Sequence, residues 1–181
     1  ASGASVDDLS PRGSHPLTDQ YFSSSNMAIV HDGTRFFRHE KVGVISKFPT
    51  ALLTLRACFN AFRPADALNC SRCEKCLRTM TSLLIHNKLG KCPSYLENDV
   101  TPSMIGSLNG TQGTYENMKR KDALRVAYLN LTIGNNHFWR EMIEPLEKMG
   151  SNDLAEAIRN KTQEYDRYIR KKSRIAAFKA F

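Results

Sequence analysis

The chain has 181 residues and carries 26 basic against 18 acidic residues, a formal charge of +8. Hydrophobic residues make up 41% and charged residues 24%, an ordinary balance for a globular protein that excludes a collagen-like or wholly disordered chain. No uncharged apolar stretch approaches the roughly 20 residues that a membrane-spanning helix needs, so no membrane association is expected. Residues 1–14 lack the basic start and apolar stretch of a signal peptide, and we expect a cytoplasmic, reducing location.

The N-terminal third predicts short elements joined by loops. Glycine, proline and serine interrupt residues 1–25, which indicates a loop or a broken strand. Residues 27–30 form a short apolar run before Asp32-Gly33, a pattern typical of a strand followed by a turn. Apolar residues recur at helical spacing over residues 35–47, although a strand also fits there, and Pro49 begins a further segment that we expect to be helical.

The best-defined helix is predicted around Ser71. The tetrapeptide from Ser71 to Glu74 fits a capping box, in which the serine hydroxyl accepts from the amide of residue 74 and the glutamate reaches back to the amide of Ser71. The helix should run to about Lys88, with Gly90 as its C-cap. Residues 91–113 hold two prolines and three glycines and predict an irregular connection.

The last third predicts three helices that pack through apolar stripes. The stripes cover residues 124–131 and 139–149, and a third helix begins at one of residues 151–153. Pro145 lies inside the second stripe and should kink or split that helix. These stripes predict core contacts between helices and no chemistry of their own.

The positive charge is concentrated at the C-terminal end. Residues 159–181 contain eight basic and two acidic residues and so supply six of the eight excess charges. Such a face attracts polyanions, which makes nucleic acid a possible partner of the basic C-terminal helix. A solvated helix end is the alternative interpretation.

Five cysteines carry most of the chemical information: Cys58, Cys70, Cys73, Cys76 and Cys92. An odd number of cysteines in a reducing compartment favours metal binding over disulfides. Three of them follow a Cys-x2-Cys-x2-Cys spacing at a helix start, where side chains three residues apart point the same way. The partial positive charge of a helix N-terminus also favours the thiolate form that a metal requires.

A tetrahedral zinc site needs a fourth thiolate, and two cysteines compete for that place. Cys58 lies twelve residues before Cys70, across a loop long enough to fold back, and is the expected ligand. Cys92 is the rival, but a helix of roughly 20 Å separates it from the triplet. Four thiolates would leave no open position on the ion, so a structural role follows. An iron–sulfur cluster is the competing interpretation, although the cysteine spacing of bacterial ferredoxins requires a further cysteine at the position of Met80.

Two strings around these cysteines carry a resemblance to a known family: Leu55-Arg56-Ala57-Cys58 and Asn69-Cys70-Ser71-Arg72-Cys73-Glu74-Lys75-Cys76-Leu77-Arg78-Thr79-Met80. They resemble the zinc-binding C-terminal part of PP-loop ATP pyrophosphatases, and in particular the 7-cyano-7-deazaguanine synthases of queuosine biosynthesis. Residues 13–19, 30–33 and 38–41 are similar to stretches upstream of the cysteines in such proteins. The resemblance covers about residues 5 to 95.

The resemblance implies an α/β fold with a mostly helical C-terminal half. Residues 1–57 would be the late part of an incomplete Rossmann-like nucleotide-hydrolase domain, residues 58–95 the zinc-binding segment and its helix, and residues 96–181 a helical subdomain. Members of the family use ATP and Mg²⁺ to adenylate a substrate carboxylate, release pyrophosphate and let ammonia or another nucleophile attack. The parent protein would therefore be an ATP-dependent C–N ligase that acts on a small-molecule substrate.

The chain departs from the family in one respect that decides what it can do alone. It lacks the Ser-Gly-Gly-x-Asp-Ser loop with which these enzymes bind ATP phosphates. We therefore expect the C-terminal part of a longer enzyme that does not turn over ATP by itself, and no catalytic residue is assigned. The alternative is a non-catalytic zinc module that binds nucleic acid or a protein partner.

Five residues remain as candidate substrate contacts: Ser14, His15, Asp19, Arg38 and Lys41. The first three lie in a Gly/Pro-rich loop, where α/β folds place ligand contacts, and ordinary turn residues are the alternative. The other two lie three residues apart, on one face of a possible helix, and could meet a phosphate or carboxylate group. A solvated charged face is the alternative for that pair, and we interpret His31 as a turn residue.

Overall fold

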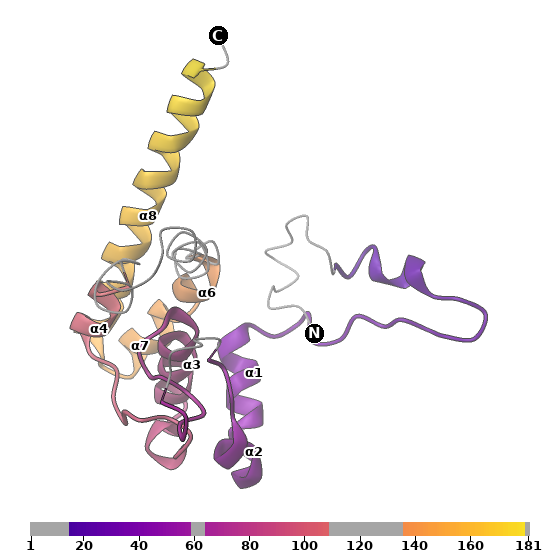
Figure 1. Cartoon of the computed structure of the whole chain (residues 1–181), viewed down its shortest axis with the longest axis horizontal. Helices are drawn as coiled ribbons and strands as arrows, with labels where there is room; N and C mark the ends of the chain where they lie inside the picture. The colour runs from indigo at the N-terminus through magenta and orange to yellow at the C-terminus, as the bar shows by residue number, and fades with distance from the viewer. Residues whose placement is uncertain (1–14, 59–63, 109–135, 180–181) are drawn as a thin grey trace.

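A computed structural model describes residues 15–58, 64–108 and 136–179 (Figure 1). Helices account for the regular structure in these ranges, and no strand occurs among the described residues. In chain order the elements are η2 (Asp19–Phe22), α1 (Arg38–Ile45), α2 (Pro49–Thr54), α3 (Glu74–Ile85), η3 (Leu89–Lys91), α4 (Pro102–Gly106), α6 (Asn136–Arg140), α7 (Ile143–Lys148) and α8 (Asn152–Lys179).

The structure gives no support to the α/β half of the predicted fold. The run over residues 27–30 forms no strand, and its one pairing is an isolated antiparallel bridge between Ser24 and Met27. Val30 is 81% exposed, so none of the described helices packs on it, and the segment extends away from those helices in Figure 1. The helices expected over residues 35–47 and from Pro49 onward are present as α1 and α2.

Helix α3 supplies the centre of the core. Leu77, Met80 and Leu83 recur every three residues on one side of the helix and are completely buried. This spacing follows from the 3.6-residue period of the helix, which brings such residues onto one face. α3 packs on α1, while α4, α6 and α7 pack on α8. The mostly helical C-terminal half is confirmed for the described residues.

The start of α3 differs from the predicted capping box. Cys73, not Ser71, is the N-cap, and no side chain caps the helix. Ser71 has a left-handed backbone, with φ at 55°, and its hydroxyl accepts hydrogen bonds from the amides of Leu96 (2.8 Å) and Glu97 (3.3 Å). The serine therefore anchors a distant loop because a tight turn, and not a helix, leads into α3.

The end of α3 also lies earlier than predicted. The helix ends at Ile85, and Asn87 takes the left-handed conformation, with φ at 54°, that we expected of Gly90. The amide of Lys88 donates to the carbonyl of Leu83 (2.8 Å), and the amide of Asn87 donates to that of Leu84 (2.9 Å). This pair of bonds is a Schellman motif, in which asparagine can replace glycine.

The C-terminal helices follow the sequence pattern where they are described. The stripe over residues 139–149 is split as predicted, because α6 ends at Arg140 and α7 begins at Ile143. Pro145 lies in the first turn of α7, where the missing amide leaves no hydrogen bond unmade. The stripe over residues 124–131 lies outside the described residues. α8 begins at Asn152, and its C-terminal half projects beyond the other helices (Figure 1). None of the described helices has both the length and the apolar character needed to cross a bilayer.

Candidate metal centre

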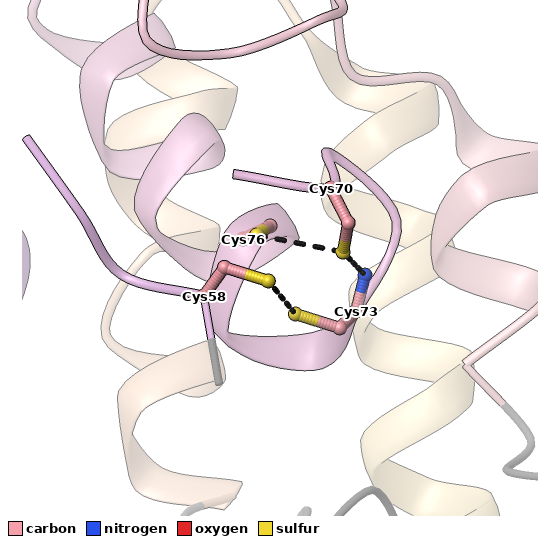
Figure 2. A group of neighbouring side chains, drawn as sticks. All are labelled: Cys58, Cys70, Cys73 and Cys76. Atoms are coloured by element: carbon pink, nitrogen blue, oxygen red, sulfur yellow. Dashed lines mark hydrogen bonds between the residues drawn. The ribbon is translucent and has the colours of Figure 1, made fainter. Parts of the chain in front are cut away.

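Four thiols converge beside the first turn of α3 (Figure 2). The Sγ atoms of Cys58, Cys70, Cys73 and Cys76 all lie within 4.8 Å of one another. Cys58 Sγ is 3.9 Å from Cys73 Sγ, and Cys70 Sγ is 3.8 Å from Cys76 Sγ. Four sulfurs bound tetrahedrally at about 2.3 Å from an ion stand about 3.8 Å apart, so the observed spacing fits a single metal ion.

Each ligand position follows from local structure. Cys73 and Cys76 are the N-cap and the third residue of α3, and they face the same side because they are three residues apart. Cys70 lies on the turn that leads into the helix, where its sulfur accepts the amide of Cys73 at 3.3 Å. Cys58 comes from the loop after α2 and completes the group from a different segment.

Cys92 is not part of the cluster. Its buried thiol donates a hydrogen bond to the carbonyl of Leu52 (3.2 Å) and lies 3.3 Å from the hydroxyl of Ser94. Cys92 is therefore not the fourth ligand, as expected, but the expected reason is wrong. The chain folds back after α3, and Nδ2 of Asn69, the neighbour of Cys70, donates to the carbonyl of Ser94 (3.0 Å). Cys92 belongs to the core that packs beneath α2.

The thiols influence one another's ionisation. Hydrogen bonds with the thiols of Cys73 and Cys76 hold the pKa of Cys70 well below its usual value. The same bond to Cys70 raises the pKa of Cys73 to about 12, and bonds to Cys70 and Cys73 raise the pKa of Cys76 further. One negative charge in a small buried space thus opposes the formation of a second. A cation that binds all four sulfurs must therefore displace protons.

Asn69 fixes the loop that carries Cys58. It is fully buried, and its Oδ1 accepts the amides of Ala57 (2.8 Å) and Cys58 (3.1 Å). Its Nδ2 donates to the carbonyls of Leu55 (2.7 Å) and Ser94 (3.0 Å). The Asn69 side chain therefore holds the backbone of Cys58, the fourth ligand, close to Cys70, its own neighbour in the sequence. Nothing in the sequence pattern predicted this role, although Asn69 stands at the head of the string that carries the family resemblance.

Glu74 connects the first turn of α3 to α6. Its Oε1 accepts Nε1 of Trp139 at 3.1 Å and lies 3.4 Å from Nε of Arg78, one turn along α3. Burial raises the pKa of Glu74, whereas Arg78 and Trp139 act in the opposite direction. The carboxylate that was predicted to cap the helix is instead used in the core.

The structure brings only some of the predicted substrate contacts together. Ser14 lies outside the described residues. Asp19 accepts the amide of His15 at 2.7 Å through Oδ1 and pairs with Nδ1 of His31 at 2.5 Å through Oδ2. The His31 side chain is 4% exposed, and its Nε2 is buried with no hydrogen-bond partner among the described residues. His31, which we interpreted as a turn residue, is therefore a member of this group.

Arg38 and Lys41 occupy a different place, on α1. The guanidinium of Arg38 lies over the ring of Phe138, 5.7 Å from its centroid. Lys41 lies against Gly33, and burial lowers its pKa. The predicted contacts are thus divided between the segment that carries Asp19 and the helix that carries Arg38.

Comparisons of the chain with protein-family models, with curated proteins and with solved structures gave no match. The resemblance to PP-loop ATP pyrophosphatases therefore stays a prediction from the sequence.

Proposed function

We propose that this chain is a helical module held together by a structural zinc ion on Cys58, Cys70, Cys73 and Cys76. The observation that carries the proposal is the mutual spacing of the four sulfurs, which matches one tetrahedral ion. The same spacing argues against an iron–sulfur cluster, in which thiolates bind different irons and so stand further apart. Four protein ligands leave no position for a substrate, which favours a structural role.

The energy of such a site is large compared with the stability of a domain. Structural zinc contributes apparent free energies of about 10–16 kcal/mol in small folded modules. A typical domain is stable by only about 5–15 kcal/mol in total. Because Cys58 follows α2 and the other ligands begin α3, the ion would join these two helices across the loop between them. We expect the helical module to lose most of its stability when the metal is removed.

Two cysteine variants test this proposal against its nearest alternative. The purified chain should contain one zinc per molecule, and Co²⁺ in its place should give the intense absorption of tetrahedral thiolate coordination. Cys58→Ser should weaken metal binding and change that spectrum. The matched variant Cys92→Ser removes an equally buried thiol and should leave both unchanged. A metal-free chain that is fully folded, or equal effects of the two substitutions, would contradict the proposal.

We further propose that the module belongs to an ATP-dependent, adenylating ligase of the 7-cyano-7-deazaguanine synthase type. The string of residues around the cysteines supports this. Asn69 begins that string, and its buried hydrogen bonds explain why an asparagine stands there. Sequencing the coding region upstream of residue 1 tests the proposal. A Ser-Gly-Gly-x-Asp-Ser segment in the same reading frame is expected. A stop codon immediately upstream would contradict the proposal.

Nucleic-acid binding is a second candidate function, favoured by the projecting end of α8 (Figure 1). Residues 167–179 contain six basic and no acidic residues. If they contact phosphates, affinity for RNA should fall steeply with added salt. Replacing Arg170 and Arg174 by glutamine should reduce the salt slope by about one for each lost contact. Lys148→Gln, which removes a cation paired with Glu144 on α7, is the matched control. No binding at low salt would exclude this function.

A further inference from the structure

Two arginines from different helices face the same aromatic ring. The guanidinium carbons of Arg38 on α1 and Arg78 on α3 lie 5.7 and 4.8 Å from the centroid of Phe138. They are therefore no further apart than these two distances together, about 10.5 Å. This is about one Debye length at 0.1 M salt, so the two positive charges repel one another. Such an arrangement favours an anion between or beside them.

Arg78 has more hydrogen-bonding capacity than the protein uses. The residue is 4% exposed, and its Nη1 is buried with no hydrogen-bond partner among the described residues. Its ion pair to Glu74, through Nε at 3.4 Å, engages a carboxylate that Trp139 also binds. Because a guanidinium carries five N–H donors, a buried one with an unpaired nitrogen is costly unless a further acceptor arrives.

The surrounding charges do not supply that acceptor. Besides Glu74, the anionic groups that influence Arg78 are Glu141 and Cys73, a ligand of the proposed metal. Glu141, the other carboxylate that influences Arg78, accepts the amide of His39 at 3.2 Å. Its Oε1 also lies 3.6 Å from Nδ1 of His39. Among the described residues, no carboxylate is hydrogen-bonded to Nη1 of Arg78, which therefore stays open to a further acceptor.

We propose that Arg38 and Arg78 form a binding site for an oxyanion, either a phosphate group or a carboxylate. Guanidinium groups bind both in a bidentate manner, and the contacts of both arginines with the Phe138 ring keep the two groups within reach of one ligand. The choice of ligand rests on the proposed ligase, whose reaction handles a substrate carboxylate and releases pyrophosphate. The site adds Arg78 to the predicted contact Arg38, and it is distinct from the pair formed by Asp19 and His31.

The test measures binding of pyrophosphate and, separately, of benzoate to the full zinc-loaded chain by calorimetry. At least one should bind, and Arg38→Gln should weaken that binding at least tenfold. Arg78→Lys keeps the charge but loses the fork geometry, and it should weaken binding as well. Lys47→Gln removes an exposed cation near the end of α1 and should have no effect. Circular dichroism and metal content show whether each variant is folded.

The outcomes separate this proposal from the function proposed above. Pyrophosphate binding that the arginine variants weaken assigns the site to a phosphate group, and benzoate binding with the same response assigns it to a carboxylate. If neither ligand binds to a chain that holds zinc, or if the variants bind as well as the parent chain, the oxyanion site is refuted while the metal site stands. If the chain binds pyrophosphate through these residues but takes up no zinc, the metal proposal fails and this one stands.

Discussion

Substitution of Asn69 by alanine should loosen the metal centre without touching a ligand. The change removes the acceptor of two amides and the donor to two carbonyls. Two of these four backbone groups, at Cys58 and Ser94, are in buried residues that water does not reach. The other two, at Leu55 and Ala57, are half-buried, so water can replace the lost bond there.

The expected magnitude follows from the buried groups. A buried polar group left without a partner costs about 1–3 kcal/mol, so two of them cost about 2–6 kcal/mol. We take about 3 kcal/mol, in the lower half of this range, which lowers Tm by roughly 6–12 °C in a domain of this size. If the lost hydrogen bonds mainly disorder the Cys58 loop, the same free energy weakens metal binding roughly a hundredfold.

Thermal unfolding of the zinc-loaded chain and competition with a chromophoric chelator measure the two quantities. Asn69→Asp is the sharper companion variant, since it keeps the acceptor oxygen but turns a carboxylate oxygen toward the carbonyls of Leu55 and Ser94. It should be at least as damaging as Asn69→Ala at pH 7. Asn160→Ala, on the exposed side of α8, is the matched control. A wild-type Tm and metal affinity in Asn69→Ala would refute the reasoning.

Three further predictions follow from local contacts. Gly43→Ala should destabilise the packing of α1 on α3 by about 1–3 kcal/mol, because a Cβ there would lie 2.4 Å from the ring of His86. Adding His86→Ala should recover part of that loss in urea denaturation, and an unchanged midpoint for Gly43→Ala would contradict the contact. Ser71→Ala should cost about 1–2 kcal/mol, since the amides of Leu96 and Glu97 lose their acceptor; equal denaturation midpoints would argue against it. Metal affinity should fall as pH falls, because the raised pKa of two of the thiols means that binding releases protons. A Co²⁺ titration repeated at several pH values measures this, and a pH-independent affinity would be inconsistent with thiolate ligands.

The cysteine cluster is the part of the site that the sequence predicted well. Spacing alone placed Cys73 and Cys76 on one side of a helix start, because three residues nearly complete a helical turn. Loop length allowed Cys58 to reach the triplet, and the structure places it there. Helix length was not what kept Cys92 out, because the chain folds back after α3 and Ser94 contacts Asn69. The inferences that succeed depend on local geometry, which the chain fixes over a few residues.

The residues that support the cluster could not be found in the same way. Asn69 makes its bonds to residues 55–58 and to Ser94, and nothing in the local pattern shows that these segments meet. The pairing of Asp19 with His31 likewise spans twelve residues of irregular chain. A side chain that joins distant segments gives no periodic signal, so its role becomes visible only once those segments are placed.

The false capping box shows why a correct local motif can still give the wrong structure. A side-chain N-cap contributes about 1 kcal/mol. At the start of α3 neither member of the motif caps the helix: Ser71 accepts two amides from residues 96 and 97, and Glu74 binds Trp139 of α6 and Arg78 one turn along α3. The turn that brings Cys70 beside Cys73 and Cys76 also places Ser71 in a left-handed conformation, outside the extended backbone typical of an N-cap. The requirement that several thiols meet at one point therefore outweighs the helix's own preference, and the N-cap moves to Cys73.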